Sequence, residues 1–192
     1  MPNPVSPDDT DAHLLRLSES GNEAAFLALY RRHQAAVFRF AAHTCGRTEI
    51  AEEVVQDVFI SLLSHPRAFQ PERGSLEAYL IGMARNLVRR HLADMSSRDI
   101  EGNTLHCAET PLDLFSHDQE LRALQRAILS LPVSYREVVV LCDIREIDYQ
   151  AAARQLGCAV GTVRSRLHRA RAILARKLRP RQVSGRGAGC AL

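Results

Sequence analysis

Apolar residues recur at intervals of three and four along most of the chain, which is the spacing of amphipathic helices. No pair of segments shows the strict apolar–polar alternation that marks neighbouring strands. Between residues 49 and 63, the apolar stripe consists of Ile50, Val54, Val55, Val58, Phe59, Leu62 and Leu63. We therefore predict an all-α protein of two small helical domains joined by a flexible linker, the second containing a helix-turn-helix.

Proline, glycine and polar runs divide this pattern into segments. The segment 65–74 holds two prolines and a glycine, and Ser75 after it is expected to cap the next helix. The periodicity fades after about residue 92, where the composition is typical of a linker. The helices predicted in the first half span residues 11–20, 23–43, 49–63 and 75–92. The predicted domains are residues 11–95 and 117–178, with a linker at 96–116 and a disordered basic tail at 179–192.

The last part of the second domain has the pattern of a helix-turn-helix. A short helix over residues 151–156 stops at Gly157, and a longer helix opens at Gly161. The longer helix carries an inward stripe of Val163, Leu167, Ala170 and Leu174. In this motif the second helix enters the major groove of DNA, so we predict a DNA-binding domain of about four helices.

Charge is distributed unevenly along the chain. From Tyr149 to the C-terminal residue there are ten Lys and Arg side chains and no Asp or Glu, although the net charge of the whole chain is only +3. A solvated helix face normally mixes both signs, so this excess predicts a polyanionic partner, namely nucleic acid. An acidic surplus elsewhere in the chain must balance it.

The sequence also argues against a membrane-spanning, secreted, disulfide-rich or prenylated protein. No apolar run approaches the ~20 residues that span a bilayer, and the N-terminal segment lacks the features of a signal peptide, so we expect a cytoplasmic protein. The five cysteines form no CxxC pair, so we expect no disulfide scaffold, metal or cofactor. A metal or redox sensor at His43 and Cys45, or at His106 and Cys107, is a less favoured alternative. Cys190 lies third from the end and does not form a prenylation box.

Two segments together resemble the sigma-70 family of bacterial RNA polymerase sigma factors. Residues 51–59 (Ala-Glu-Glu-Val-Val-Gln-Asp-Val-Phe) are similar to the family's core-binding helix. Residues 131–138, which begin with Leu-Pro and end with Arg-Glu-Val, together with residues 157–171 are similar to its C-terminal promoter-reading region. The two-domain plan, with a short linker and no domain between, resembles the compact extracytoplasmic-function group. The resemblance covers nearly everything from residue 11 to residue 178.

The resemblance implies that the helix over residues 49–63 docks on core RNA polymerase. Taken alone, its acidic side is typical of a solvated helix surface, and it would repel DNA phosphates. In the family, the corresponding helix grips basic coiled-coil helices of the polymerase clamp. The residues expected to bind core polymerase are Glu52, Glu53, Gln56, Asp57 and Phe59.

The resemblance also implies that the helix from Ser75 and the loop before it bind and open the downstream, minus-ten element. The loop over residues 65–75 would form a pocket for an extruded base. Asn86 matches the asparagine of the family's Ala-Arg-Asn pattern. The family usually has Trp where this chain has Tyr79, so either base stacking or core packing is expected of that residue. The residues expected to contact this element are Tyr79, Arg85, Asn86, Arg89 and Arg90.

The upstream, minus-thirty-five element is expected to contact the second helix of the helix-turn-helix. Arg binds a guanine edge with two hydrogen bonds, whereas Ser and Thr more often contact phosphates. In the first helix of the motif, Gln150 stands where the family often has Glu, and Ala151 where it often has Ile. The residues expected at the upstream element are Thr162, Arg164, Ser165, His168 and Arg169.

The sequence therefore predicts a sigma factor that binds core RNA polymerase and promoter DNA, has no chemistry of its own and is restrained by an anti-sigma factor. One alternative is a LuxR-type helix-turn-helix regulator, but residues 1–95 lack the strand–helix alternation of a receiver domain. Another is a metal-dependent nuclease using Glu52, Glu53 and Asp57. Neither a matching His or Lys at a defined spacing nor a phosphate-binding glycine loop accompanies these carboxylates.

Overall fold

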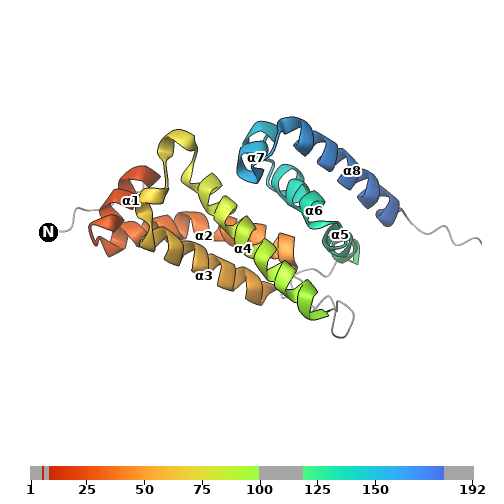
Figure 1. Ribbon diagram of the computed structural model, residues 1–192, viewed down its shortest axis with the longest axis horizontal. Coiled ribbons are helices and arrows are strands. Elements are labelled where there is room, and N and C mark those ends of the chain that lie inside the picture. The colour runs from red at the N-terminus through yellow and green to blue at the C-terminus, as the bar shows by residue number, and fades with distance from the viewer. Residues whose placement is uncertain (1–5, 7–8, 100–118, 180–192) are drawn as a thin grey trace, which may run out of the picture.

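The computed structural model describes residues 6, 9–99 and 119–179, and every regular element in these ranges is helical (Figure 1). The first group of helices is α1 (Asp11–Glu19), α2 (Glu23–Cys45), α3 (Thr48–Ser64) and α4 (Leu76–Asp99). The second group is α5 (Gln119–Leu129), α6 (Val133–Val139), α7 (Tyr149–Leu156) and α8 (Val160–Leu178). This arrangement confirms the predicted all-α class. None of the described helices is long and apolar enough to cross a membrane.

Side-chain caps fix where several helices begin. Thr10 Oγ1 accepts a hydrogen bond from the His13 N–H at 3.3 Å at the start of α1. Ser75 Oγ accepts one from the Ala78 N–H at 3.2 Å before α4. Each cap satisfies an amide that has no partner within the helix. The predicted cap at Ser75 is confirmed.

The structure moves the end of the predicted helix that follows Ser75 and adds detail to the loop before it. α4 continues past Leu92 to Asp99, because no proline or glycine interrupts it there, so the first residues of the predicted linker are helical. The loop before α4 contains two short 3₁₀ turns, Pro66–Ala68 and Pro71–Arg73, each opened by its proline. The remainder of the linker and the tail beyond Arg179 lie outside the described residues.

The core of the first group lies where α2 packs on α1, α3 and α4. In the second group, α8 packs on α5, α6 and α7, and a π-helical turn, Val140–Ile144, follows α6 directly. The predicted inward stripe of α8 (Val163, Leu167, Ala170 and Leu174) is buried. The large side chains that are fully buried include Leu14, Leu29, Phe40, Leu62, Leu80, Leu141 and Leu167.

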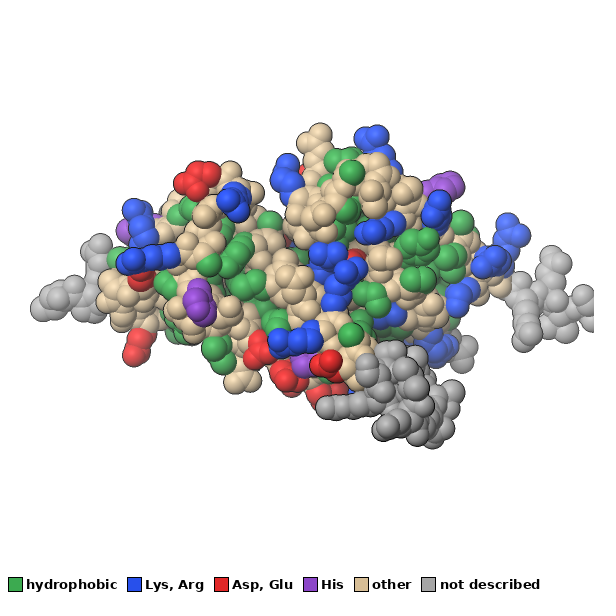
Figure 2. Space-filling view, viewed as in Figure 1, with side chains coloured by type: hydrophobic (Ala, Val, Ile, Leu, Met, Phe, Trp, Pro, Cys, Tyr) green, Lys and Arg blue, Asp and Glu red, His purple; other side chains and the backbone are tan. Residues whose placement is uncertain are grey.

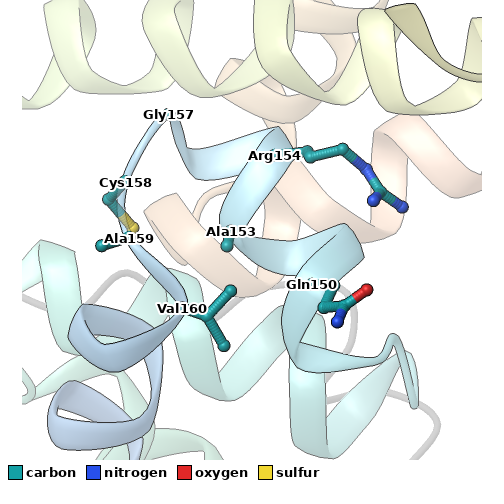
Figure 3. A pocket seen from close by; sticks show the side chains of 7 residues that line it. All are labelled: Gln150, Ala153, Arg154, Gly157, Cys158, Ala159 and Val160. Carbon is teal, nitrogen blue, oxygen red and sulfur yellow. The ribbon is translucent and has the colours of Figure 1, made fainter.

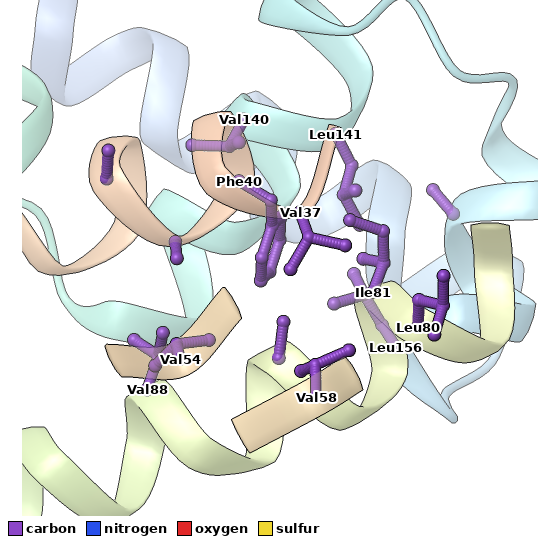
Figure 4. Close-up of a cluster of buried hydrophobic side chains, with 14 of the residues drawn as sticks. Val37, Phe40, Val54, Val58, Leu80, Ile81, Val88, Val140, Leu141 and Leu156 are labelled. Carbon is purple, nitrogen blue, oxygen red and sulfur yellow. The ribbon is translucent and has the colours of Figure 1, made fainter. Parts of the chain in front are cut away.

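The two groups of helices share one continuous core instead of standing apart. Figure 4 shows Leu141 and Leu156 of the second group beside Ile81 of the first. Gly46 ends α2 with a φ of +73° and packs against Leu129 of α5. A Cβ at this position would come within 2.7 Å of a Leu129 methyl carbon. The pattern of separate amphipathic segments did not reveal this contact.

We predict that removing the cap of α7 weakens the helix-turn-helix. Asp148 Oδ1 accepts hydrogen bonds from the N–H groups of Gln150 at 2.9 Å and Ala151 at 2.8 Å. Asp148→Ala should lower the free energy of unfolding by about 1 kcal/mol, whereas Asp148→Asn, which retains a capping oxygen, should lower it less. Urea unfolding followed by circular dichroism measures both. Equal stability of Asp148→Ala and the unsubstituted protein would contradict the prediction.

Candidate nucleic-acid and polymerase interfaces

The helix-turn-helix is formed by α7, a tight turn and α8. α7 ends at Gly157, whose φ of +60° is a left-handed conformation that glycine adopts without steric cost. The Cys158 N–H donates to the Ala153 carbonyl at 3.1 Å and closes the turn. Figure 3 shows this turn, with Gln150 and Arg154 projecting from the same side of α7. The turn leads directly into α8, which carries the predicted DNA-binding residues.

The start of α8 presents basic and polar side chains on one side of the helix. Arg164, Ser165, His168 and Arg169 are exposed, and Thr162 is half-buried. The guanidinium carbon of Arg164 lies 6.0 Å from the centroid of the Tyr149 ring, and this cation–π contact positions the arginine. The structure therefore brings together all five residues predicted for the upstream element. Their contacts with DNA stay a prediction.

Arg171, one of the ten basic residues after Tyr149, is paired within the protein. Its Nη2 lies 2.5 Å from Asp143 Oδ1 and its Nε lies 3.2 Å from Asp143 Oδ2. The hydrogen bonds and charge of Asp143 raise the pKa of Arg171 above its usual range. This pair fastens α8 to the π-helical turn, so the Arg171 charge supports the fold as well as any DNA contact.

The acidic side of α3 faces solvent, as the sequence predicts. Glu52, Glu53 and Gln56 are exposed and Asp57 is half-buried, whereas the valines of α3 are buried. Figure 2 shows acidic side chains gathered along this edge, while Lys and Arg side chains are more numerous over α7 and α8. The acidic side of α3 and the basic surface of α7 and α8 therefore suit partners of opposite charge.

Phe59, unlike the acidic residues of α3, is buried, although it lines the same groove as Glu52 and Gln56. It is 3% exposed, and its ring centroid lies 6.2 Å from that of Phe26 and 4.8 Å from that of Tyr30. The three rings line a groove of about 780 Å³ between α2 and α3, with Ile60 and Leu63 exposed along it. Phe59 therefore shapes this aromatic groove and does not present a free ring to a partner. Leu63, predicted to point inward, is 47% exposed.

His91 of α4 joins the acidic side of α3, a contact that the sequence reasoning missed. One donor atom from each of Glu53, Asp57 and His91 lies within 4.8 Å of the others. The Nε2 atom of His91 is buried without a hydrogen-bond partner among the described residues. Carboxylates and imidazole are donors that divalent cations accept, although exposed acidic groups also gather without an ion. Helices far apart in sequence supply these groups, so spacing alone gave no signal.

The residues predicted for the downstream element lie at the junction of the two groups. Tyr79 is half-buried and packs against Phe69, with ring centroids 5.7 Å apart. Both rings line a cavity of about 460 Å³ between the loop before α4, α4 itself and α7. Asn86 lines the same cavity and is exposed, and Arg90 is exposed nearby on α4. Tyr79 thus packs in the fold as one of the two alternatives expected and also lines the cavity, while stacking of a base on its ring stays a prediction.

Arg85 and Arg89, also predicted to contact DNA, are bound to a carboxylate of the second group. Glu137 Oε1 accepts hydrogen bonds from Arg85 Nε at 3.1 Å and from Arg89 Nε at 2.7 Å, and Oε2 accepts one from Arg89 Nη2 at 3.2 Å. Glu137 is 0% exposed. We call these three residues the interdomain clasp. The sequence signal for it was slight: Glu137 directly precedes the apolar run that begins at Val138.

Comparison with known proteins agrees with this geometry. The chain matches the family models of sigma-70 region 2 over residues 29–98 and sigma-70 region 4 over residues 121–174. The ECF RNA polymerase sigma factor SigE of Mycolicibacterium smegmatis is 32% identical over 87% of this chain and 68% of its own length. SigM of Mycobacterium tuberculosis is 32% identical over 88% of this chain and 85% of its own length. The chain belongs to the ECF RNA polymerase sigma factors.

Two solved structures share the fold of this ECF sigma factor. CnrH, in its complex with the cytosolic domain of CnrY, superimposes with a TM-score of 0.67 and 29% identity, over 88% of this chain and 97% of that chain. The sigma factor RpoE of Bartonella quintana, in complex with the anti-sigma factor NepR, shares the fold with a TM-score of 0.62 and 24% identity, over 82% of this chain and 98% of that chain. The described region of the chain therefore has the architecture of known sigma factors.

We predict that Cys45 and Cys142 react slowly with alkylating reagents. Burial raises the pKa of both thiols, and the charge of Asp143 raises that of Cys142 further. The thiolate is the reactive form, so at pH 8 both groups should stay mainly protonated and gain reactivity only at higher pH. The measurement is the iodoacetamide alkylation rate between pH 7 and pH 10, followed by peptide mass spectrometry.

The same peptides in urea-unfolded protein provide the control for alkylation. The prediction would be contradicted if both thiols reacted as fast in the folded protein at pH 8 as in urea. That result would instead favour a sensory role for Cys45. The second pair of that alternative, His106 and Cys107, lies outside the described residues, as does Cys190.

Proposed function

We propose that this ECF sigma factor binds core RNA polymerase, directs it to specific promoters and helps to separate the DNA strands. The observation that carries the proposal is the presence, in one chain, of an exposed basic helix-turn-helix face and a separate acidic helix with an apolar groove. The relatives that the chain matches are sigma factors. In this proposal the protein acts by positioning polymerase on the promoter and catalyses no reaction itself. Such a protein works in the cytoplasm, where polymerase meets the chromosome.

The LuxR-type regulator is not favoured. A LuxR-type regulator usually has an effector or receiver domain before its helix-turn-helix, and residues 9–99 form four α-helices without the strands of a receiver domain. The match of this segment to sigma-70 region 2 explains the same helices directly.

The acidic side of α3 and the aromatic groove beside it form the proposed polymerase-docking surface. Glu52, Glu53, Gln56 and Asp57 offer hydrogen bonds and negative charge to a basic helical partner. The exposed Ile60 and Leu63 beside this side add apolar area, and buried apolar contacts near the centre of an interface supply most of its binding energy. The two features adjoin on α3, so one helical partner can contact both.

The two regions are proposed to contact different parts of the promoter. Region 4, within residues 117–178, uses the exposed side of α8 in the major groove of duplex DNA. Region 2, within residues 11–95, uses α4 and the loop before it at the melted downstream element. The cavity beside Tyr79 and Asn86 has room for an unstacked base.

An anti-sigma factor is the proposed regulator. CnrH and the Bartonella quintana RpoE, whose folds match this chain, were each solved in complex with another protein, which is an anti-sigma factor in the RpoE structure. A protein partner of this kind would restrain the sigma factor until it is needed.

Reversing the charge of the acidic side of α3 should weaken polymerase binding. We expect Glu53→Lys/Asp57→Lys to lower affinity for core RNA polymerase at least about tenfold, because both new charges would face a basic partner. The control is Glu23→Lys/Glu146→Lys, which makes the same change in net charge at exposed positions elsewhere. Affinity is measured by fluorescence anisotropy, with circular dichroism to check folding. Unchanged affinity of the folded α3 variant would refute the docking surface.

Substitutions in the two regions should alter different promoter elements. Arg164→Ala should cost about 1–3 kcal/mol of DNA-binding free energy and relax the preference at one or two upstream base pairs. Asn86→Ala should leave the upstream preference intact and weaken open-complex formation. The two effects should add, because distant sites without shared partners act independently.

Transcription by reconstituted holoenzyme from promoters randomised at both elements tests this division. Arg176→Ala, at an exposed position near the end of α8, controls for the loss of one positive charge. A changed downstream consensus with Arg164→Ala, or a changed upstream consensus with Asn86→Ala, would contradict the assignment of one region to each element.

A further inference from the structure

Three side chains that can bind a metal ion converge where α4 packs on α3. Glu53 and Asp57 lie four residues apart on α3 and therefore share one side of that helix, and His91 comes from α4. One donor atom of each side chain lies within 4.8 Å of the other two. Two ligands one helical turn apart, with a third from a facing helix, are a common arrangement in the metal sites of helical proteins.

The imidazole of His91 has a nitrogen whose hydrogen-bonding capacity is unused. Its Nε2 atom is buried and has no hydrogen-bond partner among the described residues. A buried polar atom without a partner costs free energy, and folded proteins seldom retain one unless a water molecule or an ion satisfies it. Either nitrogen of a neutral imidazole can bind a metal ion, so this atom is available as a ligand.

The two carboxylates supply the charge that a cation would neutralise. Within the described ranges, neither Glu53 nor Asp57 forms an ion pair with a basic side chain. Two negative charges held close together repel each other, and a divalent cation between them replaces this repulsion with attraction. The charge of the pair therefore matches that of a divalent ion.

The spacing of the donor atoms is close to that around a bound ion. Zinc binds carboxylate oxygen and imidazole nitrogen at about 2.0–2.2 Å, which places two ligand atoms of a tetrahedral site about 3.4 Å apart. Glu53 is exposed and Asp57 is half-buried, so both side chains have room to rotate and close the gap from 4.8 Å. Three protein ligands leave the fourth position to water.

The mixture of donors indicates which cation the site would take. Imidazole nitrogen is a ligand for zinc and other transition metals, whereas magnesium prefers oxygen ligands and retains most of its water. We propose that Glu53, Asp57 and His91 form a binding site for a divalent transition-metal cation, with Zn²⁺ as the ion that its donors suit. We call these three residues the α3–α4 metal site.

The α3–α4 metal site overlaps the proposed polymerase-docking surface, because Glu53 and Asp57 belong to both. A bound divalent cation would cancel the two negative charges that this surface offers to a basic partner. Zinc binding should therefore weaken docking on core RNA polymerase. This consequence rests on the proposed function, whereas the metal site itself does not.

The first test measures zinc binding by the full-length chain without polymerase. Metal is removed with a chelator, and zinc chloride is titrated into the protein by isothermal titration calorimetry. Glu53→Gln and His91→Gln should each lower the zinc affinity at least about tenfold, because loss of even a supporting contact in a metal site costs that much. Magnesium chloride should bind more weakly than zinc chloride. Unchanged zinc affinity in a folded His91→Gln protein, or equal affinities for the two cations, would overturn the proposal.

Two variants control for losses that do not arise at the site. Glu49→Gln removes a charge at an exposed position one turn before Glu53, and His65→Gln removes an exposed histidine. Neither residue belongs to the α3–α4 metal site, so both variants should keep the zinc affinity within about twofold. Equal losses in Glu49→Gln and Glu53→Gln would show diffuse attraction to an acidic surface and would refute a defined site. Because Glu53 is exposed, Glu53→Gln keeps the test decisive if His91→Gln fails to fold.

The second test separates the metal site from the docking surface. Saturating zinc chloride should lower the affinity of the unsubstituted chain for core RNA polymerase at least about threefold, because it cancels charge at the interface. It should leave the affinity of His91→Gln unchanged, since that variant keeps both carboxylates but lacks the imidazole. An equal loss in both proteins would place the zinc effect on polymerase and overturn the competition. Zinc binding that depends on His91, with docking insensitive to zinc and to Glu53→Lys/Asp57→Lys, would support the metal site and count against the docking surface alone.

Discussion

A fully buried carboxylate imposes the strongest constraint on how this protein is assembled. An ionised Glu137 is costly in an apolar interior unless basic groups meet it with well-directed hydrogen bonds. In this structure these groups are Arg85 and Arg89, which belong to the other group of helices. The charge therefore selects one docking of the two regions, whereas apolar packing alone would tolerate neighbouring orientations.

The same constraint connects the fold to function. The guanidinium groups that satisfy Glu137 are chemically suited to phosphates, and the helix that carries them also carries Asn86 and Tyr79 beside a cavity. In this structure both arginines are bound to that carboxylate. The charges of α8 are arranged differently, since its basic and polar side chains at the start of the helix stay exposed while Asp143 holds Arg171.

The proposed polymerase-docking surface lies on a helix whose other side belongs to the core. The valines of α3 are buried against α2 and α4, which leaves the acidic side outward. Periodicity predicted this division correctly for Glu52 and Glu53. It did not predict the aromatic groove, because Phe26 and Tyr30 come from α2 and meet Phe59 only after the helices pack. Leu63 belongs to the apolar stripe by spacing, yet it lies exposed beside this groove.

The sequence by itself determined the helices, several of their caps, the inward stripe of α8 and the helix-turn-helix, because these depend on contacts between residues close in the chain. It also placed the predicted upstream residues on one side of α8. Only the tertiary structure decided that α4 meets α6 and α7, that His91 joins Glu53 and Asp57, and that Glu137 binds Arg85 and Arg89. These partners are separated by tens of residues, and local periodicity says which side of a helix is buried but not which helix buries it.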